Sequence, residues 1–108
     1  MKLFEVILAI DTFDDEGTIF AQKIDGSYHS KSEAVVIEMT DEELQMKTSE
    51  VAKARCPGKS YFLEVFVVQE VLEGWVSNHG GKQPNIEQAC HCLIHYAEHD
   101  AYPESFFS

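Results

Sequence analysis

A group of cysteine and histidine residues near the C-terminus is the part of the sequence most able to do metal or redox chemistry. It comprises Cys90, His91, Cys92, His95 and His99. Histidines four residues apart lie on one face of a helix, where two of them can share a metal ion. Three such histidines drift by about 40° per step, because each helical residue turns by about 100°, so their ring nitrogens converge poorly. Cysteines separated by one residue lack the spacing of a zinc site. We therefore predict no metal and no cofactor, with Cys90 in the core and the histidines toward solvent, where a pH-sensitive surface is the alternative.

Catalysis by a nucleophile would need a cysteine or serine beside a base and a group that binds developing charge. Cys56 precedes Pro57 at the expected end of a helix, where the helix dipole disfavours a thiolate. Cys92 and His95 are three residues apart, a spacing that is common by chance. The nucleophile elbow, the phosphate-binding loops and the HExxH zinc motif are all missing. The sequence thus predicts that the chain is not an enzyme.

Clustered carboxylates form the second group of chemical interest, because they attract cationic partners. The first cluster falls within six residues at an expected turn: Asp11, Asp14, Asp15 and Glu16. No Lys or Arg lies between Lys2 and Lys23 to neutralise it. A solvated turn would explain part of this pattern, since Asp favours turn geometry. The later run Asp41–Glu43 is fully explained by helix capping.

A second acidic region near the C-terminus is interleaved with aromatic residues. We predict that it contributes Glu98, Asp100, Tyr102, Glu104 and Phe106 to a partner-binding surface. No basic residue follows Lys82, and aromatic side chains beside carboxylates are typical of an interface for a cationic protein. A tail that packs back onto the helices would explain the same residues equally well.

Length and composition limit the classes of function. The chain has 108 residues, 19 acidic against 8 basic, a net charge of −11 and 44% hydrophobic residues. These values predict one domain, residues 1–108, with a real core. Acidity disfavours nucleic acid and anionic membranes as partners.

The cysteines and the first apolar run indicate the compartment. Three cysteines, an odd number without framework spacing, favour a reducing cytoplasm. The apolar run Leu3–Ile10 is too short for a membrane span, and it lacks the cleavage site of a signal peptide.

The expected elements change from strands to helices along the chain. Strands are predicted at Leu3–Ile10, Thr18–Ile24 and Ala34–Met39, and helices at 40–55, Tyr61–Trp75 and 86–98, with a tail at 100–108. Apolar runs rich in β-branched and aromatic residues indicate the strands. The segment Tyr61–Trp75 has the composition of a strand, but fifteen residues without a turn signal favour a helix. The fold class is therefore α+β, an N-terminal three-stranded antiparallel sheet at about 3–39 followed by about three helices packed on one face.

A strongly acidic domain of this size, with Asp11–Glu16, the segment Glu98–Phe107 and no catalytic motif, resembles the immunity proteins of bacterial toxin–immunity systems. Those of contact-dependent inhibition and of the barstar type are examples. The resemblance implies a non-catalytic inhibitor that covers the basic active site of a toxin, often a nuclease. The physical logic is independent of it, because carboxylates facing Lys or Arg speed association. The alternatives are a phage-type inhibitor that mimics nucleic acid, and a homo-oligomeric or adaptor domain whose acidity only confers solubility.

Overall fold

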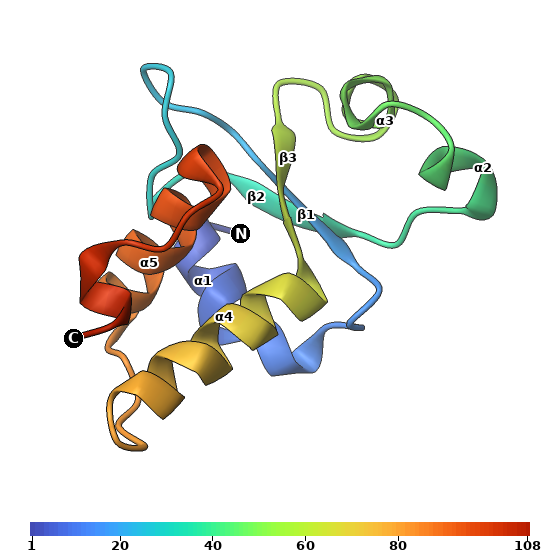
Figure 1. The fold of residues 1–108 in the computed structure, drawn as a ribbon. Coiled ribbons are helices and arrows are strands. Elements are labelled where there is room, and N and C mark those ends of the chain that lie inside the picture. The colour runs from blue at the N-terminus through green and yellow to red at the C-terminus, as the bar shows by residue number, and fades with distance from the viewer.

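The fold is α+β and has a three-stranded antiparallel sheet at its centre, in the order β2-β1-β3. The computed structural model describes residues 1–108. The strands are β1 (Thr18–Ala21), β2 (Ala34–Ile37) and β3 (Ser60–Glu64). The helices are α1 (Leu3–Leu8), α2 (Asp41–Leu44), α3 (Thr48–Arg55), α4 (Val65–Asn78) and α5 (Ile86–His99). Figure 1 shows α1, α4 and α5 gathered on one side of the molecule, with α2 and α3 at the opposite end.

Alternate side chains of the central strand enter two separate cores, because successive strand residues face opposite sides of a sheet. Ile19 and Ala21 belong to the larger core, which contains side chains of α1, α4 and α5. Phe20 belongs to the smaller core, together with Val51 and Ala52 of α3. The prediction of helices on one face only was wrong, since α3 covers the second face.

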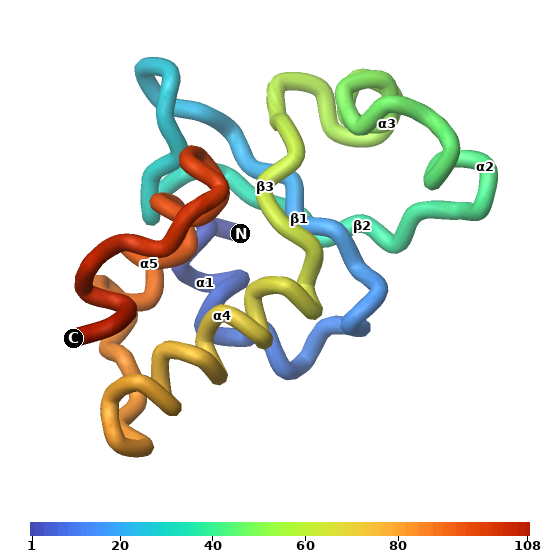
Figure 2. Tube along the Cα trace, in the orientation of Figure 1, coloured from blue at the N-terminus to red at the C-terminus, as the bar shows by residue number.

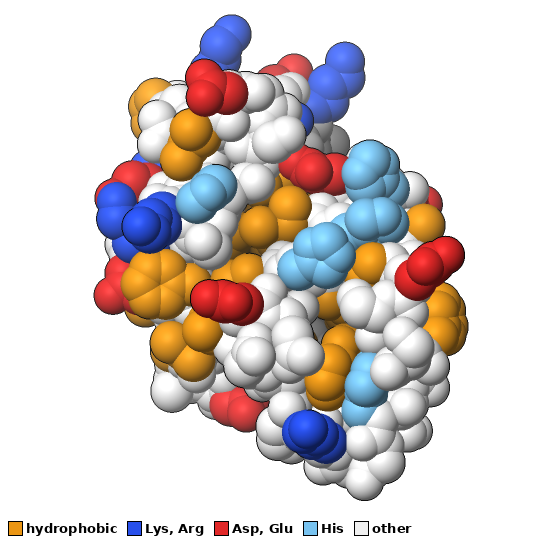
Figure 3. All heavy atoms as spheres, turned by 90° about the vertical axis from the view of Figure 1, so that its left-hand side faces the viewer, with side chains coloured by type: hydrophobic (Ala, Val, Ile, Leu, Met, Phe, Trp, Pro, Cys, Tyr) orange, Lys and Arg blue, Asp and Glu red, His pale blue; other side chains and the backbone are white.

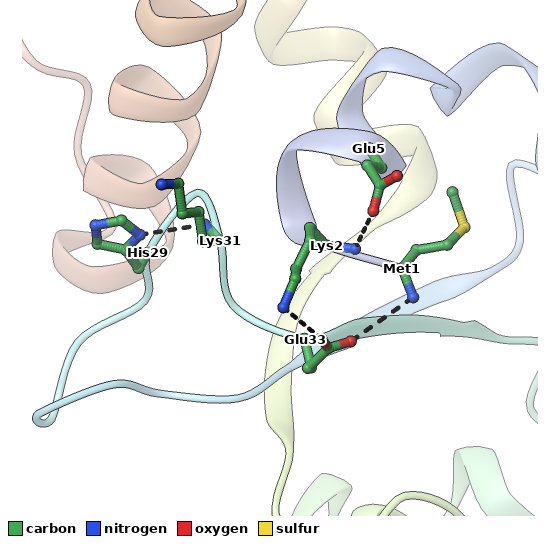
Figure 4. Close-up of polar contacts among 6 residues, drawn as sticks. All are labelled: Met1, Lys2, Glu5, His29, Lys31 and Glu33. Atoms are coloured by element: carbon green, nitrogen blue, oxygen red, sulfur yellow. Dashed lines mark hydrogen bonds and ion pairs between the residues drawn. The ribbon is translucent and has the colours of Figure 1, made fainter.

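The predicted strand Leu3–Ile10 is instead the helix α1 followed by the 3-10 turn η1 (Ile10–Thr12). Its buried residues recur at the helical spacing of three and four: Leu3, Val6, Ile7 and Ile10. The backbone N–H of Lys2 donates to Glu5 Oε1 at 2.7 Å, which caps the first turn. Lys2 Nζ also lies 2.6 Å from Glu33 Oε1, tying the start of the helix to the segment before β2 (Figure 4). Capping and one buried stripe therefore outweigh the β propensity of this run.

The segment Tyr61–Trp75 is divided between two elements, and the prediction of a helix is confirmed only from Val65 onward. Residues 60–64 form β3, because their backbone pairs with β1 and completes the third strand. The chain turns into α4 where Val65 N donates to Gly17 O at 2.9 Å. At Gly17 an added Cβ would lie 2.8 Å from Val36 Cγ1, so only glycine permits this close approach of the chain to β2.

The other predicted elements are confirmed in shortened or divided form. Strands begin at Thr18 and Ala34 as predicted, and α5 closely matches the predicted helix 86–98. The predicted helix 40–55 is two helices, α2 and α3. An ion pair joins them, with Arg55 Nη1 2.8 Å from Glu43 Oε1. The pKa of the Glu43 carboxyl is lowered by a hydrogen bond from the Thr40 backbone N–H and, to a smaller extent, by one from the Arg55 guanidinium.

None of the helices of the chain combines the length and the apolar character needed to cross a membrane.

The C-terminal segment packs back onto the body, as the alternative interpretation of that region predicted. After α5 the chain returns beside that helix (Figure 2) and forms a second 3-10 turn, η2 (Glu104–Phe106). Phe106 lies so close to α4 that a Cβ added at Gly74 would be 2.8 Å from its Cζ atom. Asn78 Nδ2 of α4 donates to Phe106 O at 3.2 Å. The tail is therefore part of the folded domain.

Candidate functional site

The first acidic cluster lies at the N-terminal end of α4. It was predicted at a turn between two strands, but it connects η1 to β1, because the run before it is helical. The Asp14 carboxylate accepts from Glu16 N at 2.9 Å, which shapes the turn. Asp15 O accepts from Phe66 N at 3.2 Å, and Asp11 Oδ1 accepts from Gln69 Nε2 at 3.4 Å. These bonds place the cluster against the first two turns of α4, with all four carboxylate residues exposed.

The second cluster is divided by the fold. Glu98 Oε2 accepts from Tyr28 N at 2.9 Å, and this bond holds the 25–32 loop against the end of α5. Asp100, at φ 52°, is the left-handed residue that ends α5. Tyr102 remains 40% exposed, whereas Phe106 is only 6% exposed and belongs to the larger core. Phe106 therefore stabilises the fold and does not present a contact surface, while its neighbour Phe107 is 65% exposed.

Helix α4 lies between the two clusters and adds charge of its own. Its outward residues recur at helical spacing: Phe66, Glu70, Glu73 and Ser77. Phe66 is 45% exposed, although it is large and apolar. Tyr102 stacks on Phe106 with ring centroids 4.0 Å apart, and Phe106 packs against Gly74, so the tail brings Tyr102 to this helix. Burial raises the pKa of Tyr102, and Tyr96, Cys92 and Glu70 raise it further.

One surface therefore unites residues from three separate segments. We call it the α4 face: Asp11, Asp15, Phe66, Glu70, Glu73 and Tyr102. Asp14 and Glu16 belong to the same cluster as Asp11 and Asp15, Glu104 begins η2, and Glu98 and Asp100 lie at the end of α5. Phe66, Glu70 and Glu73 were not predicted as site residues; the signal for two of them is that Glu70 and Glu73 are three residues apart, the spacing of one helix face.

No acidic residue of the α4 face forms an ion pair. The ion pairs of the chain use Glu33, with Lys2 and the N-terminal amine, and Glu43, with Arg55. Four of the eight basic residues lie in the segment 47–59, which runs from the N-cap of α3 to just past its end. Between residues 60 and 108, seven acidic residues share one lysine, Lys82. The carboxylates of the α4 face are therefore available to cations from another molecule.

The cysteine and histidine group divides between core and surface. Cys90 and Cys92 are buried, while a row of histidine side chains crosses the face shown in Figure 3. Ring centroids are 6.4 Å apart for His91 and His95, and 4.6 Å for His95 and His99. His95 Nδ1 lies 2.9 Å from Ala101 O, so this nitrogen is engaged with the tail. No three His, Cys, Asp or Glu side chains come together in a way that could hold a metal ion.

The buried thiols should resist modification in the native protein. Burial raises the pKa of Cys90 and of Cys92 to about 11, so roughly one thiol in a thousand is ionised at pH 8. In the native protein, we expect a disulfide reagent to label both cysteines no faster than the protein unfolds. In the protein unfolded by urea, we expect labelling within seconds. Because these values are raised from 9.0, the free energy of unfolding should fall between about pH 9 and 11. Rapid native labelling of Cys90 would contradict this packing of α5.

Comparison with known protein families, characterised proteins and solved structures finds no match to this chain. A functional assignment therefore depends on the chemistry of the surface. Carboxylates without basic neighbours, interspersed with exposed aromatic rings, can bind lysine and arginine side chains and cover apolar area beside them.

Proposed function

We propose that this protein is a non-catalytic inhibitor of the immunity-protein kind, which binds and blocks a basic protein partner through the α4 face. A nuclease domain of a toxin is a partner of the right chemistry, because its active site is cationic in order to hold phosphates. Acidic residues placed there would compete with the substrate and occupy its charge sites.

The observation that carries this proposal is the meeting of separate acidic segments on one helix. Asp11 and Asp15 lie against one side of α4, and Tyr102 lies on the other side, stacked on Phe106 where that ring packs against Gly74. Such convergence without ion pairing leaves several carboxylates exposed, at some cost in mutual repulsion. A protein that needed acidity only for solubility would gain as much from charges spread over its whole surface.

Exposed aromatic rings on the same surface support binding to a protein in particular. Phe66 is 45% exposed and Tyr102 is 40% exposed. Interfaces obtain most of their binding free energy from a few such anchors, while surrounding charges set specificity and association rate. The α4 face supplies both kinds of group.

Capture of a partner from an extract of the source cell, with charge-reversed variants as controls, tests this proposal. The wild-type chain should retain a basic protein, and Glu70→Lys combined with Glu73→Lys should lose it. The matched control reverses Asp41 and Glu42 on α2, which are equally exposed but lie at the other end of the molecule. This control should cost some helix stability through the dipole and leave capture intact.

The activity of the captured protein then separates the alternatives. A toxin whose catalysis is abolished at equal stoichiometry would support the immunity-type inhibitor. A DNA-binding or defence protein released from DNA would instead indicate a mimic of nucleic acid. Capture only of further copies of this chain, or capture that the α4 variant leaves unchanged, would overturn the proposal in favour of an adaptor or homo-oligomeric domain.

We propose further that the protein acts in the cytoplasm. Cys56, Cys90 and Cys92 are all free and buried, and a domain with unpaired thiols suits a reducing compartment. Fractionation of the source cell would test this directly, because recovery in a secreted or periplasmic fraction would contradict it.

A further inference from the structure

Two histidines near the C-terminal end of α5 bring their imidazole rings close together at the surface. His95 and His99 are four residues apart, about one turn of the helix, and their ring centroids are 4.6 Å apart. His91 lies one turn earlier, and its ring centroid is 6.4 Å from that of His95. Histidine side chains form a row on the face shown in Figure 3. The three rings on α5 are thus one close pair and a more distant neighbour.

The distance between the paired rings matches the distance that a shared metal ion would impose. A zinc ion lies about 2.0–2.1 Å from an imidazole nitrogen, and therefore about 3.2 Å from the centroid of the ring. Two rings that bind one ion at an angle of about 90–110°, as in octahedral and tetrahedral sites, have centroids about 4.5–5.2 Å apart. The 4.6 Å between His95 and His99 falls in this range. The 6.4 Å between His91 and His95 exceeds it.

A hydrogen bond to the tail fixes where one of these rings carries its proton. His95 Nδ1 lies 2.9 Å from Ala101 O. A carbonyl oxygen only accepts, so Nδ1 donates and Nε2 keeps the lone pair that a metal ion requires. Metal-binding histidines typically donate their second ring nitrogen to such an oxygen, because the bond holds the tautomer and the orientation of the ring. The contact with the tail therefore prepares His95 to act as a ligand.

Both rings are open to an ion from solvent. His99 is exposed and His95 is half-buried. The one buried side-chain nitrogen or oxygen without a hydrogen-bond partner is the indole nitrogen of Trp75. The unpaired Nε2 of His95 therefore reaches solvent, and an ion can approach it without any change in the fold.

The charge around the pair favours a cation. Both histidines lie toward the C-terminal end of α5, where the helix dipole is negative. Glu98 and Asp100 are the neighbours of His99 in sequence, and the chain carries a net charge of −11. Lys23 is the one lysine or arginine in the pocket that it lines with Glu98 and His99. A dication at the pair would therefore be attracted by most of its surroundings.

We propose that His95 Nε2 and a ring nitrogen of His99 together bind a divalent transition-metal ion of the zinc, nickel and copper class. Neutral imidazole is a ligand that suits these ions. Two protein ligands leave the other coordination positions open for water or for a group from another molecule. The prediction of no metal rested on the poor convergence of three imidazoles and on the cysteine spacing, and it does not extend to this pair. The inference is independent of the function proposed for the α4 face.

Zinc chloride added to the isotope-labelled protein at about pH 7.5, where neutral imidazole is abundant, tests the proposal. The nitrogen resonances of the five histidine rings are followed during the titration. We expect Nε2 of His95 and one ring nitrogen of His99 to shift together and to reach saturation. The rings of His29 and His79, which lie on other segments of the chain, should remain unchanged.

Variants of the three histidines on α5 separate the pair from the row. His99→Gln should weaken zinc binding about tenfold or more, because the second ligand of a linked pair is lost. This change does not act through the tail, because the bond to Ala101 belongs to His95. His95→Gln should weaken binding to a similar extent. His91→Gln is the matched control on the same helix and should leave the affinity unchanged.

Three results would overturn the proposal. The first is a titration that fails to saturate, and the second is a zinc affinity that His99→Gln leaves unchanged. The third is a loss of affinity in His91→Gln as large as that in His99→Gln, because the row as a whole would then attract the ion without a defined pair.

Discussion

Phe106→Ala is expected to lower the free energy of unfolding by about 3 kcal/mol, whereas Phe107→Ala should change it by about 0.5 kcal/mol or less. The two rings are neighbours in sequence but differ in environment. Phe106 is 6% exposed and packs against Gly74 of α4, and Phe107 is 65% exposed. Loss of the first ring leaves a cavity in the larger core, while loss of the second removes little buried area. Urea unfolding followed by circular dichroism measures both values.

This pair of variants tests whether the tail belongs to the folded domain. Equal and small effects would mean that residues 101–108 do not pack on α4 in solution, and Tyr102 would then no longer be held beside this helix. A large effect at Phe107 with none at Phe106 would mean that the 3-10 turn η2 is rotated.

The second large effect is expected on binding. Reversal of Glu70 and Glu73 to lysine should weaken the complex with the captured basic partner by about 2–5 kcal/mol, the range found when charges buried at an interface lose their partners. Stability should change by about 0.5 kcal/mol or less, because both side chains are exposed and unpaired. Titration calorimetry measures the first quantity and thermal unfolding the second.

Salt supplies an independent control for this prediction. Rising ionic strength should slow association of the wild-type chain more than it speeds dissociation, because exposed charges act mainly on encounter. The Glu70 and Glu73 variant should lose most of this salt dependence, and the reversal of Asp41 and Glu42 should retain it. Affinity and salt dependence equal to those of the wild type in the α4 variant would contradict the assignment of this face.

The fold class could be predicted from the sequence, but the first strand could not be distinguished from a helix. Leu3–Ile10 is apolar and rich in β-formers, and its helical stripe is hidden because Phe4 and Leu8 are also apolar. The deciding interactions are the bond from Lys2 N to Glu5 and the ion pair from Lys2 to Glu33, 31 residues away. Similarly, Ser60–Glu64 becomes a strand because it pairs with the edge of β1, about 40 residues earlier in the chain. The residue pattern of this segment alone does not show that such a partner is present.

The candidate site could be predicted only in parts. The clusters at Asp11–Glu16 and near the C-terminus were visible as runs of carboxylates without neighbouring bases. The meeting of Asp11, Asp15 and Tyr102 on α4 was not, because it depends on Phe66 N meeting Asp15 O and on Phe106 packing beside Gly74. Phe106 was predicted at the partner-binding surface, but its ring lies in the larger core. The sequence of an acidic tail does not show which of its aromatic residues face the core and which face solvent.

The central claim is that separate acidic segments act as one docking surface around α4. Amide resonances of the isotope-labelled protein, followed while the captured basic partner is added, test this most directly. We expect the largest changes together at Asp11, Asp15, Phe66, Glu70, Glu73 and Tyr102, with little change on α2 and α3. Changes confined to α2 and α3 or to the histidine row of α5, with the α4 face unaffected, would contradict it.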